Sequence, residues 1–280
     1  MKRIIITLAT LALSASFVSA QDLKAVSETF NSGATALSSG EKVEALSLFK
    51  KAMTDAAALG EEGKEIIDNC KNVIPNLMTS IAKDTFRDGS VEEAINMATE
   101  AEKTANDFGD AEAAADIKKV IGQFLFQKGN NALNSKDFAA AADSYRQVLA
   151  AEPENGAAAL RLGMALSSAG NLSEAEEAFK TAAANGQEAA ANKQLGNVYL
   201  KAASAALKAK DFQTALDKAV QSIGINPSAN ACKIAGNAAA QLKKYKEAVS
   251  YFSKYLDLNP SAADAAQTKA TIEALKKAIQ

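Results

Sequence analysis

Histidine and tryptophan are both absent from the 280-residue chain, which has only 2 cysteines, 4 prolines and 15 glycines. Without histidine there is no imidazole base, no Ser-His or Cys-His nucleophile pair and no histidine metal ligand. Few proline or glycine residues interrupt the abundant alanine, lysine, glutamate and leucine, which are strong helix formers. The composition predicts an all-helical protein and disfavours most familiar hydrolase chemistry. We expect no metal site and no cofactor.

The first twenty residues have the pattern of a secretory signal. Lys2 and Arg3 precede an apolar run from Ile4 to Leu13, and small residues end at Ala20. We predict cleavage after Ala20. A retained signal anchor is the alternative, but the apolar run is shorter than the ~20 residues that span a bilayer. Residue 21 is glutamine, so no cysteine is available there for lipid attachment.

The mature chain is therefore predicted to be exported, periplasmic and not a lipoprotein, with no transmembrane segment. Removing Lys2 and Arg3 lowers the basic count from 31 to 29, against 33 acidic residues. This balance argues against a nucleic-acid partner, because phosphates require a basic face. Cys70 and Cys232 could form a disulfide in an exported protein, but we favour two separate buried thiols, because the two cysteines lie in distant parts of a repetitive chain.

Six copies of a short motif run along the chain, each an alanine followed four residues later by an aromatic residue or a second alanine. The leading alanines lie at positions 45, 94, 141, 175, 215 and 248. Five residues before each one is a turn position, occupied by Gly40, Gly89, Lys136, Gly170, Lys210 and Lys243. Seven residues earlier still is a small residue: Gly33, Ala82, Gly129, Gly163, Ala203 and Gly236. We expect two antiparallel helices per copy, brought close together by the small residue.

These slots resemble the tetratricopeptide repeat family, whose repeats have a small residue, an alanine, an aromatic residue and a closing proline. Pro153, Pro227 and Pro260 each lie twelve residues after their alanine, where a proline ends one helix and can begin the next. The resemblance implies a right-handed α-solenoid of about six helix pairs with a C-terminal capping helix. The tryptophan of the family is missing, so its place must be filled by Met78, Leu125, Ala159, Tyr199 and Cys232.

The first two spacings exceed the family's period, which predicts lengthened first helices in the N-terminal copies. We expect about four extra turns there, or ~20 Å, a kink or a new segment at Pro75, and a smaller extension between Glu188 and Leu195. The predicted organisation is a signal peptide over 1–20, two lengthened units over 21–121, four units over 122–262 and a capping helix over 263–280. Asn259 could cap that last helix, with Pro260 in its first turn.

The resemblance implies a concave binding face lined by the first helix of each copy. Carried over residue by residue, the candidate partner-binding groove consists of Phe30, Leu37, Lys83, Phe86, Phe126, Asn130, Leu133, Leu160, Met164, Leu200, Leu207, Lys233, Asn237 and Gln241. A largely apolar groove suits an amphipathic helix or a nonpolar peptide. Alternatively, the lengthened helices fold over this face and bury it. Lys233 and Asn237 resemble half of a carboxylate clamp, although a solvated surface is the simpler interpretation.

Other chemistry is sparse. Adjacent acids such as Glu176 and Glu177 do not share a helix face, so we interpret them as solvated charge. An enzyme is the least favoured class, and a non-catalytic scaffold that binds a protein or peptide of the bacterial cell envelope is the most favoured. Two alternatives stay open. One is a homo-oligomeric structural element; the other is a glycan-capture accessory of an outer-membrane uptake system, which 6% aromatic residues support poorly.

Overall fold

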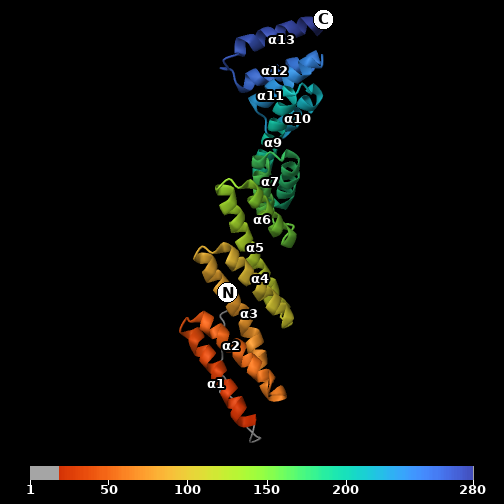
Figure 1. Ribbon diagram of the computed structural model, residues 1–280. Helices are drawn as coiled ribbons and strands as arrows, with labels where there is room; N and C mark the ends of the chain where they lie inside the picture. Colours follow the sequence, from red (N-terminus) through yellow and green to blue (C-terminus); the bar gives the residue numbers. More distant parts are fainter. Residues whose placement is uncertain (1–18, 280) are drawn as a thin grey trace. The chain divides into compact units, whose positions relative to one another are not determined.

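A computed structural model describes residues 19–279, and the predicted signal peptide lies almost wholly outside them. The described residues form helices joined by short turns, without any strand (Figure 1). Each of the six copies is a helix pair: α1 (Ser19–Ser38) with α2 (Lys42–Ala57), α3 (Lys64–Arg87) with α4 (Val91–Asp107), α5 (Ala111–Asn134) with α6 (Phe138–Ala151), α7 (Gly156–Ala169) with α8 (Leu172–Ala182), α9 (Glu188–Lys208) with α10 (Phe212–Ile225), and α11 (Ala229–Gln241) with α12 (Tyr245–Leu258). A last helix, α13 (Ala265–Ile279), follows them.

The chain divides into two compact units, one ending at Leu125 and the other beginning at Phe126, so the boundary falls inside α5. Within each unit, helices pack mainly against their neighbours in the sequence, as α1 does on α2, α3 on α4 and α12 on α13. The predicted α-solenoid of six helix pairs with a final helix is therefore confirmed. We call the pairs repeats 1 to 6 in chain order, and the first helix of each pair its A helix.

The turn between the two helices has the same backbone conformation in all six repeats. The residue at the predicted turn position has a positive φ, between 60° and 96°, whether it is glycine or lysine: Gly40, Gly89, Lys136, Gly170, Lys210 and Lys243. This left-handed conformation ends a helix and costs glycine little, whereas a side chain makes it unfavourable. Three lysines thus occupy positions where glycine is the easier choice.

The small residue of the A helix faces the aromatic residue of the second helix. A Cβ atom built on Gly163 would lie 2.6 Å from the Phe179 ring, and one on Gly236 would lie 2.7 Å from Phe252. Gly129 meets Tyr145 in the same way at 2.8 Å, and Gly33 meets Phe49 at 3.1 Å. At Gly129, Gly163 and Gly236 the ring occupies the space that a side chain would fill, whereas the contact at Gly33 is looser.

Repeats 2 and 5 solve the same contact with two alanines instead. Ala82 and Ala98 occupy the two slots in repeat 2, and Ala203 and Ala219 occupy them in repeat 5. All four alanines are fully buried. Around Ala82 and Ala98 the remaining space is filled by Val120 and Phe124 of α5. In repeat 2 the side chains of a third helix thus fill the space that an aromatic residue of the second helix fills in other repeats. The spacing of the two slots is unchanged.

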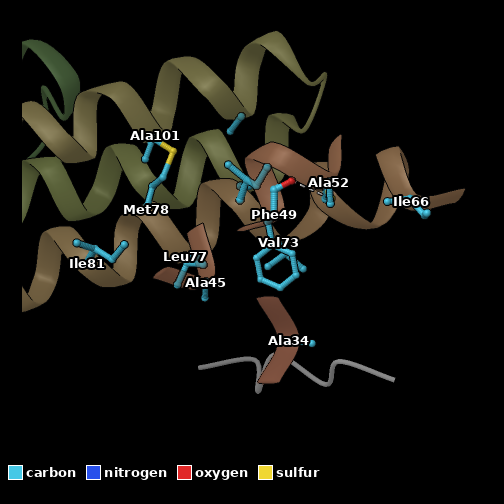
Figure 2. Close-up of a cluster of buried hydrophobic side chains, with 14 of the residues drawn as sticks. Ala34, Ala45, Phe49, Ala52, Ile66, Val73, Leu77, Met78, Ile81 and Ala101 are labelled. Carbon is cyan, nitrogen blue, oxygen red and sulfur yellow. Dashed lines mark hydrogen bonds between the residues drawn. The ribbon is translucent and has the colours of Figure 1, made fainter. Parts of the chain in front are cut away.

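The core of the first unit surrounds Phe49, which is fully buried among side chains of α1, α2 and α3 (Figure 2). The extra length of α3 contributes long aliphatic residues to this core, including Ile66, Ile74 and Leu77. The residues expected in place of the missing tryptophan are all buried as predicted: Met78, Leu125, Ala159, Tyr199 and Cys232.

The lengthening of the N-terminal helices is smaller than predicted. α3 and α5 have 24 residues each, against 14 in α7, a gain of about three turns. The rest of the insertion lies in a longer α2 and α4 and in a 3-10 turn over Gly60–Gly63. α3 runs continuously through Pro75, so no new segment begins there. α9 has 21 residues, which confirms the extension after Glu188.

The prolines follow the ends of the second helices as predicted, but the expectations that they begin the next helices and that Asn259 caps the last one are wrong. Pro153, Pro227 and Pro260 lie in the loops between repeats, two residues after the last residue of each second helix, and not in the first turn of the next helix. Asn259 ends α12, whereas α13 begins only at Ala265. Proline after a helix end cannot continue the helix, so here it stops one helix without starting another.

Both cysteines are buried and free, as favoured from the sequence. Cys70 lies in α3 and its Sγ is 3.4 Å from the carbonyl oxygen of Phe49. Burial raises the pKa of the Cys70 thiol to about 12, and it also raises the pKa of Cys232. A thiol with a raised pKa is a poor nucleophile, so both behave as small apolar side chains.

Candidate functional site

The candidate groove residues come from the A helices, and we refer to their solvent side as the A-helix face. The apolar members of the set are all half-buried: Phe30, Leu37, Phe86, Phe126, Leu133, Leu160, Met164, Leu200 and Leu207. Most of them pack against the core of their own unit. The apolar part of the A-helix face is thus partly used for packing between helices, and partly accessible.

The aromatic members make specific ring contacts. The ring centroids of Phe30 and Phe49 are 5.2 Å apart. Phe86 stacks on Phe124 of the following A helix at 4.3 Å, with the rings 6° from parallel. Phe126 meets Tyr145 edge to face at 5.6 Å. Because these contacts hold neighbouring helices together, replacing Phe86 or Phe126 would disturb the fold as well as any bound partner.

The polar members are the most accessible part of the face. Lys83, Asn237 and Gln241 are exposed. Asn130 is half-buried and its Oδ1 accepts a hydrogen bond of 2.8 Å from the Tyr145 hydroxyl. Side chains that are exposed and not committed to packing can donate or accept hydrogen bonds with a partner at little cost to the fold.

Lys233 is engaged within the chain. Its Nζ lies 2.7 Å from Oδ2 of Asp264, in the loop before α13, and 5.5 Å from the centroid of the Tyr255 ring. The Tyr255 hydroxyl donates to Oδ1 of the same carboxylate. Lys233 and Tyr255 hold the pKa of Asp264 below its usual range. The cation of the predicted half clamp, Lys233, is therefore already paired with the carboxylate of Asp264. This ion pair ties the loop before α13 to repeat 6.

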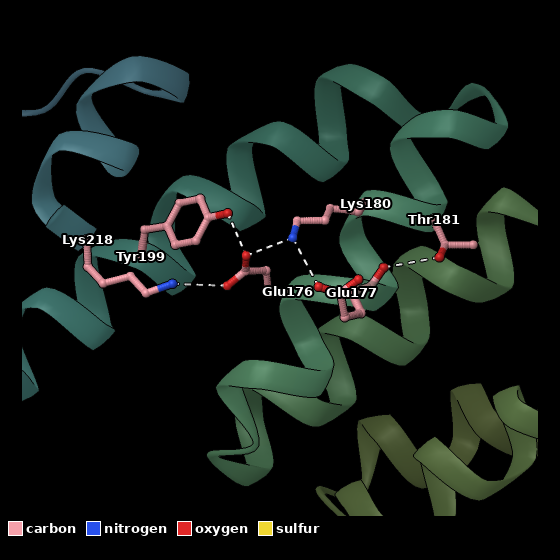
Figure 3. A network of polar contacts seen from close by, with 6 residues as sticks. All are labelled: Glu176, Glu177, Lys180, Thr181, Tyr199 and Lys218. Atoms are coloured by element: carbon pink, nitrogen blue, oxygen red, sulfur yellow. Dashed lines mark hydrogen bonds and ion pairs between the residues drawn. The ribbon is translucent and has the colours of Figure 1, made fainter. Parts of the chain in front are cut away.

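A second polar network joins three consecutive helices (Figure 3). Glu176 of α8 accepts from Nζ of Lys180 at 2.9 Å, from the Tyr199 hydroxyl of α9 at 2.8 Å and from Nζ of Lys218 of α10 at 3.3 Å. Lys218 also lies 4.8 Å from the centroid of the Tyr199 ring. The expectation that Glu176 is solvated charge is wrong: its side chain is 19% exposed, whereas that of Glu177 is 73% exposed.

The electrostatics of this network follow from its partners. Burial by itself would raise the pKa of Glu176, but hydrogen bonds from Lys180, Tyr199 and Lys218 outweigh it and hold the pKa below its usual value. Burial and the Glu176 carboxylate together raise the pKa of Tyr199 to about 12. Both shifts keep the carboxylate charged and the phenol neutral at neutral pH. The arrangement therefore acts as a fixed ionic link between repeats 4 and 5.

Over residues 19–279 no cluster of three or more cysteine, aspartate or glutamate side chains has the geometry to hold a metal ion. Across that same stretch, no helix combines the length and the apolar character needed to cross a membrane.

Comparison with known proteins gives one family and several solved structures. The tetratricopeptide repeat family matches residues 126–190 and 200–263. No curated protein matches the chain. A crystal structure of MamA is 22% identical, covers 56% of this chain and 82% of its own, and has a TM-score of 0.41. A structure of MamA from Desulfovibrio magneticus RS-1, residues 41 to the end, is 20% identical. The match covers 68% of this chain and 97% of that MamA chain, with a TM-score of 0.38.

YrrB, described as a TPR protein with an unusual peptide-binding site, is 19% identical, with 74% of this chain and 96% of YrrB covered and a TM-score of 0.38. The two family matches coincide with α5 to α12, where paired helices, turn conformation and small-residue contacts repeat. This chain therefore contains tetratricopeptide repeats over residues 126–190 and 200–263.

Proposed function

We propose that the protein is a non-catalytic interaction scaffold of the bacterial cell envelope, which binds a protein or peptide through the A-helix face. The observation that carries the proposal is the composition of that face, which has half-buried apolar side chains in repeats 1 to 5 and exposed polar side chains at Lys83, Asn237 and Gln241. An apolar strip with polar groups beside it suits an amphipathic helix or an extended peptide. The predicted signal sequence is the reason for placing this activity outside the cytoplasm.

The A-helix face offers recognition without evident chemistry. Its polar residues are amides and lysines, and the ionic networks at Asp264 and at Glu176 are closed by internal partners. A bound segment would gain from burying the accessible parts of Leu160, Met164 and Leu200. The function is therefore recognition, and its strength depends on which partner segment presents apolar side chains at helical spacing.

The test is retention of envelope proteins by the mature chain immobilised on a resin. Aromatic substitutions are unsuitable, because Phe86 and Phe126 hold helices together. A face variant, Lys83→Glu/Gln241→Glu, changes exposed residues only. Its matched control, Lys50→Glu/Gln147→Glu, makes the same charge change on the exposed sides of the second helices α2 and α6.

We expect one or more proteins to be retained by the wild type and by the control, and to be lost from the face variant. Equal retention by all three proteins would show that the A-helix face is not the binding surface. A short peptide derived from the retained protein should then bind the wild type by calorimetry, and the face variant at least ~10-fold more weakly.

A further inference from the structure

The turns that join the two helices of each repeat carry opposite charge in different repeats. We define the turn edge as the turn residue with the two residues before it and the four after it. In repeats 5 and 6 the edge has two acids, Asp211 and Glu247, against five exposed lysines: Lys208, Lys210, Lys243, Lys244 and Lys246. Nζ of Lys244 lies 3.5 Å from Oε1 of Gln213, which places the two turns side by side. These lysines form one basic turn edge.

Four of the five lysines of the basic turn edge are not used by the fold. In the part of the chain that the structure describes, Lys208, Lys210, Lys243 and Lys246 form no ion pair. Two of them, Lys210 and Lys243, also have a φ of about 60°, a conformation that a side chain makes unfavourable. A Cβ atom built on Gly170, at the same turn position, would have nothing within 4 Å. A lysine there projects into solvent and gains no packing in return for the backbone strain.

The same edge is acidic in repeats 1 and 2. It has two basic residues, Lys42 and Arg87, and both already pair with Asp84, at 2.5 Å and 2.9 Å. The Lys42 contact joins the turn of repeat 1 to the end of α3 and brings these two turns side by side. Within residues 19–279 the exposed acids Glu41, Glu44, Asp88 and Glu93 form no ion pair, and they make up the acidic turn edge.

We propose that the basic turn edge of one copy docks on the acidic turn edge of a second copy. The two edges have the same backbone architecture, each presents four unpaired charges, and the signs are opposite. The rest of the chain follows the same division: residues 21–125 have 19 acidic and 11 basic residues, whereas residues 126–280 have 14 acidic and 18 basic. A surface of complementary charge is thus present on the protein itself, which favours a second copy over an unrelated anion.

The contact is heterologous, because it joins two different edges. Each pair of copies leaves one basic and one acidic edge free, so association continues beyond a dimer unless the arrangement closes into a ring. Exposed ion pairs are individually weak and are screened by salt. The association is therefore weak, reversible and favoured at low ionic strength. It does not depend on the proposed binding at the A-helix face, which shares only Gln241 with the basic turn edge and none of the charged residues of either edge.

The experiment uses the mature chain, residues 21–280, in sedimentation velocity at one high protein concentration. A basic-edge variant reverses four lysines, Lys208→Glu/Lys210→Glu/Lys243→Glu/Lys246→Glu. An acidic-edge variant reverses four acids, Glu41→Lys/Glu44→Lys/Asp88→Lys/Glu93→Lys. The matched control for the first makes the same charge change at exposed lysines elsewhere, Lys50→Glu/Lys118→Glu/Lys193→Glu/Lys269→Glu. All variants must first show the helical circular dichroism of the wild type.

We expect the wild type to associate, with an association constant that falls about tenfold between ~0.05 M and ~0.5 M salt. Each edge variant alone should be monomeric, a mixture of the two should associate again, and the control should associate like the wild type. A monomeric wild type at low salt would overturn the proposal. So would a control that fails like the basic-edge variant, or a mixture that stays monomeric. Binding of monomeric wild type to anionic phospholipid vesicles, lost in the basic-edge variant, would assign the lysines to a lipid surface instead.

Discussion

Repeats 1 and 2 differ from repeats 4 and 6 in length and yet pair their helices in the same way. α3 has 24 residues where α7 has 14 and α11 has 13, and the family match covers only residues 126–190 and 200–263. Gly33 nevertheless meets Phe49 as Gly163 meets Phe179, and Gly40 and Gly170 have nearly the same φ. The pairing depends on a few slots on either side of one turn, so length can vary at the far end without changing it.

The cores of the two regions also differ in the kind of side chain that fills them. Around α3 the buried residues include Ile66, Ile74 and Leu77, while around α10 to α12 they are mostly alanines with Leu216 and Phe252. Alanines let helix backbones approach closely and bury little area each, whereas long aliphatic side chains bury more. The added length of the N-terminal helices is thus accompanied by a change in how the core is built.

The largest effect is expected from the buried aromatic of each region. Phe49→Ala and Phe179→Ala should each lower the free energy of unfolding by about 3–5 kcal/mol, because both rings are almost fully buried and their loss leaves a cavity. Urea denaturation followed by circular dichroism measures both. A loss below ~1 kcal/mol for Phe49→Ala would mean that the pairing in repeat 1 is not equivalent to that in repeat 4.

A graded effect is expected at the small residue. Gly163→Ala places a Cβ 2.6 Å from the Phe179 ring, and this overpacking should cost about 1–3 kcal/mol. At Gly33 the distance is 3.1 Å, so the ring needs to move less. Alanine also gains about 0.5–1 kcal/mol over glycine within a helix. Gly33→Ala should therefore be close to neutral in the same denaturation experiment.

The control for this comparison restores the lost space. In Gly163→Ala/Phe179→Leu the smaller side chain should remove most of the clash, so the double variant should be less destabilised than the sum of its two single changes. Additive losses would show that the glycine is needed for a reason other than the ring opposite it.

The turn position offers a smaller test in both directions. Lys243→Gly should stabilise the protein by about 0.5–1 kcal/mol, because glycine adopts a positive φ without strain but loses more entropy on folding. Gly170→Lys should destabilise it by a similar amount. Thermal unfolding of the two variants beside the wild type measures both shifts. Shifts of the same sign in both would contradict the view that the turns are equivalent.

The smallest effect is expected from the network at Glu176, which has no counterpart described in the first unit. Its pKa is lowered in the folded protein, so its contribution is present above the unfolded value of about 4.3 and is lost as the pH falls through the folded value. Glu176→Gln should flatten the loss of stability below about pH 4.3 and cost less than ~1 kcal/mol at neutral pH, since Lys180 and Lys218 are partly exposed. Glu154→Gln, at an exposed residue, is the control; an equal response in both variants would exclude a specific role for Glu176.

The features that could be predicted from the sequence are those fixed by short, constant offsets. The turn at Gly170, the small residue Gly163 and the aromatic Phe179 lie at set distances from Ala175, and packing follows from those distances. The end of α12 at Asn259 could not be predicted in this way, because an asparagine before a proline can either end one helix or cap the next.

The candidate site was less accessible to prediction. Phe86 occupies a face slot by its position in the repeat, but its ring stacks on Phe124, 38 residues later, and only the packing of α3 beside α5 reveals this. Glu176 gains Tyr199 and Lys218 from two other helices, and no sequence spacing links them. Periodicity predicts which face of a helix a residue lies on. Whether that residue packs, forms an ion pair or stays accessible depends on the side chains that the next repeat places against it.

The distribution of tyrosine has a practical consequence. The chain has no tryptophan, and its five tyrosines, Tyr145, Tyr199, Tyr245, Tyr251 and Tyr255, all follow Phe126. Intrinsic fluorescence therefore reports on the second unit alone, while the amide signal in the far ultraviolet averages over both. If the first unit unfolds by itself, the far-ultraviolet ellipticity should decrease before the tyrosine emission changes. Unfolding of the first unit can thus be detected without any added label.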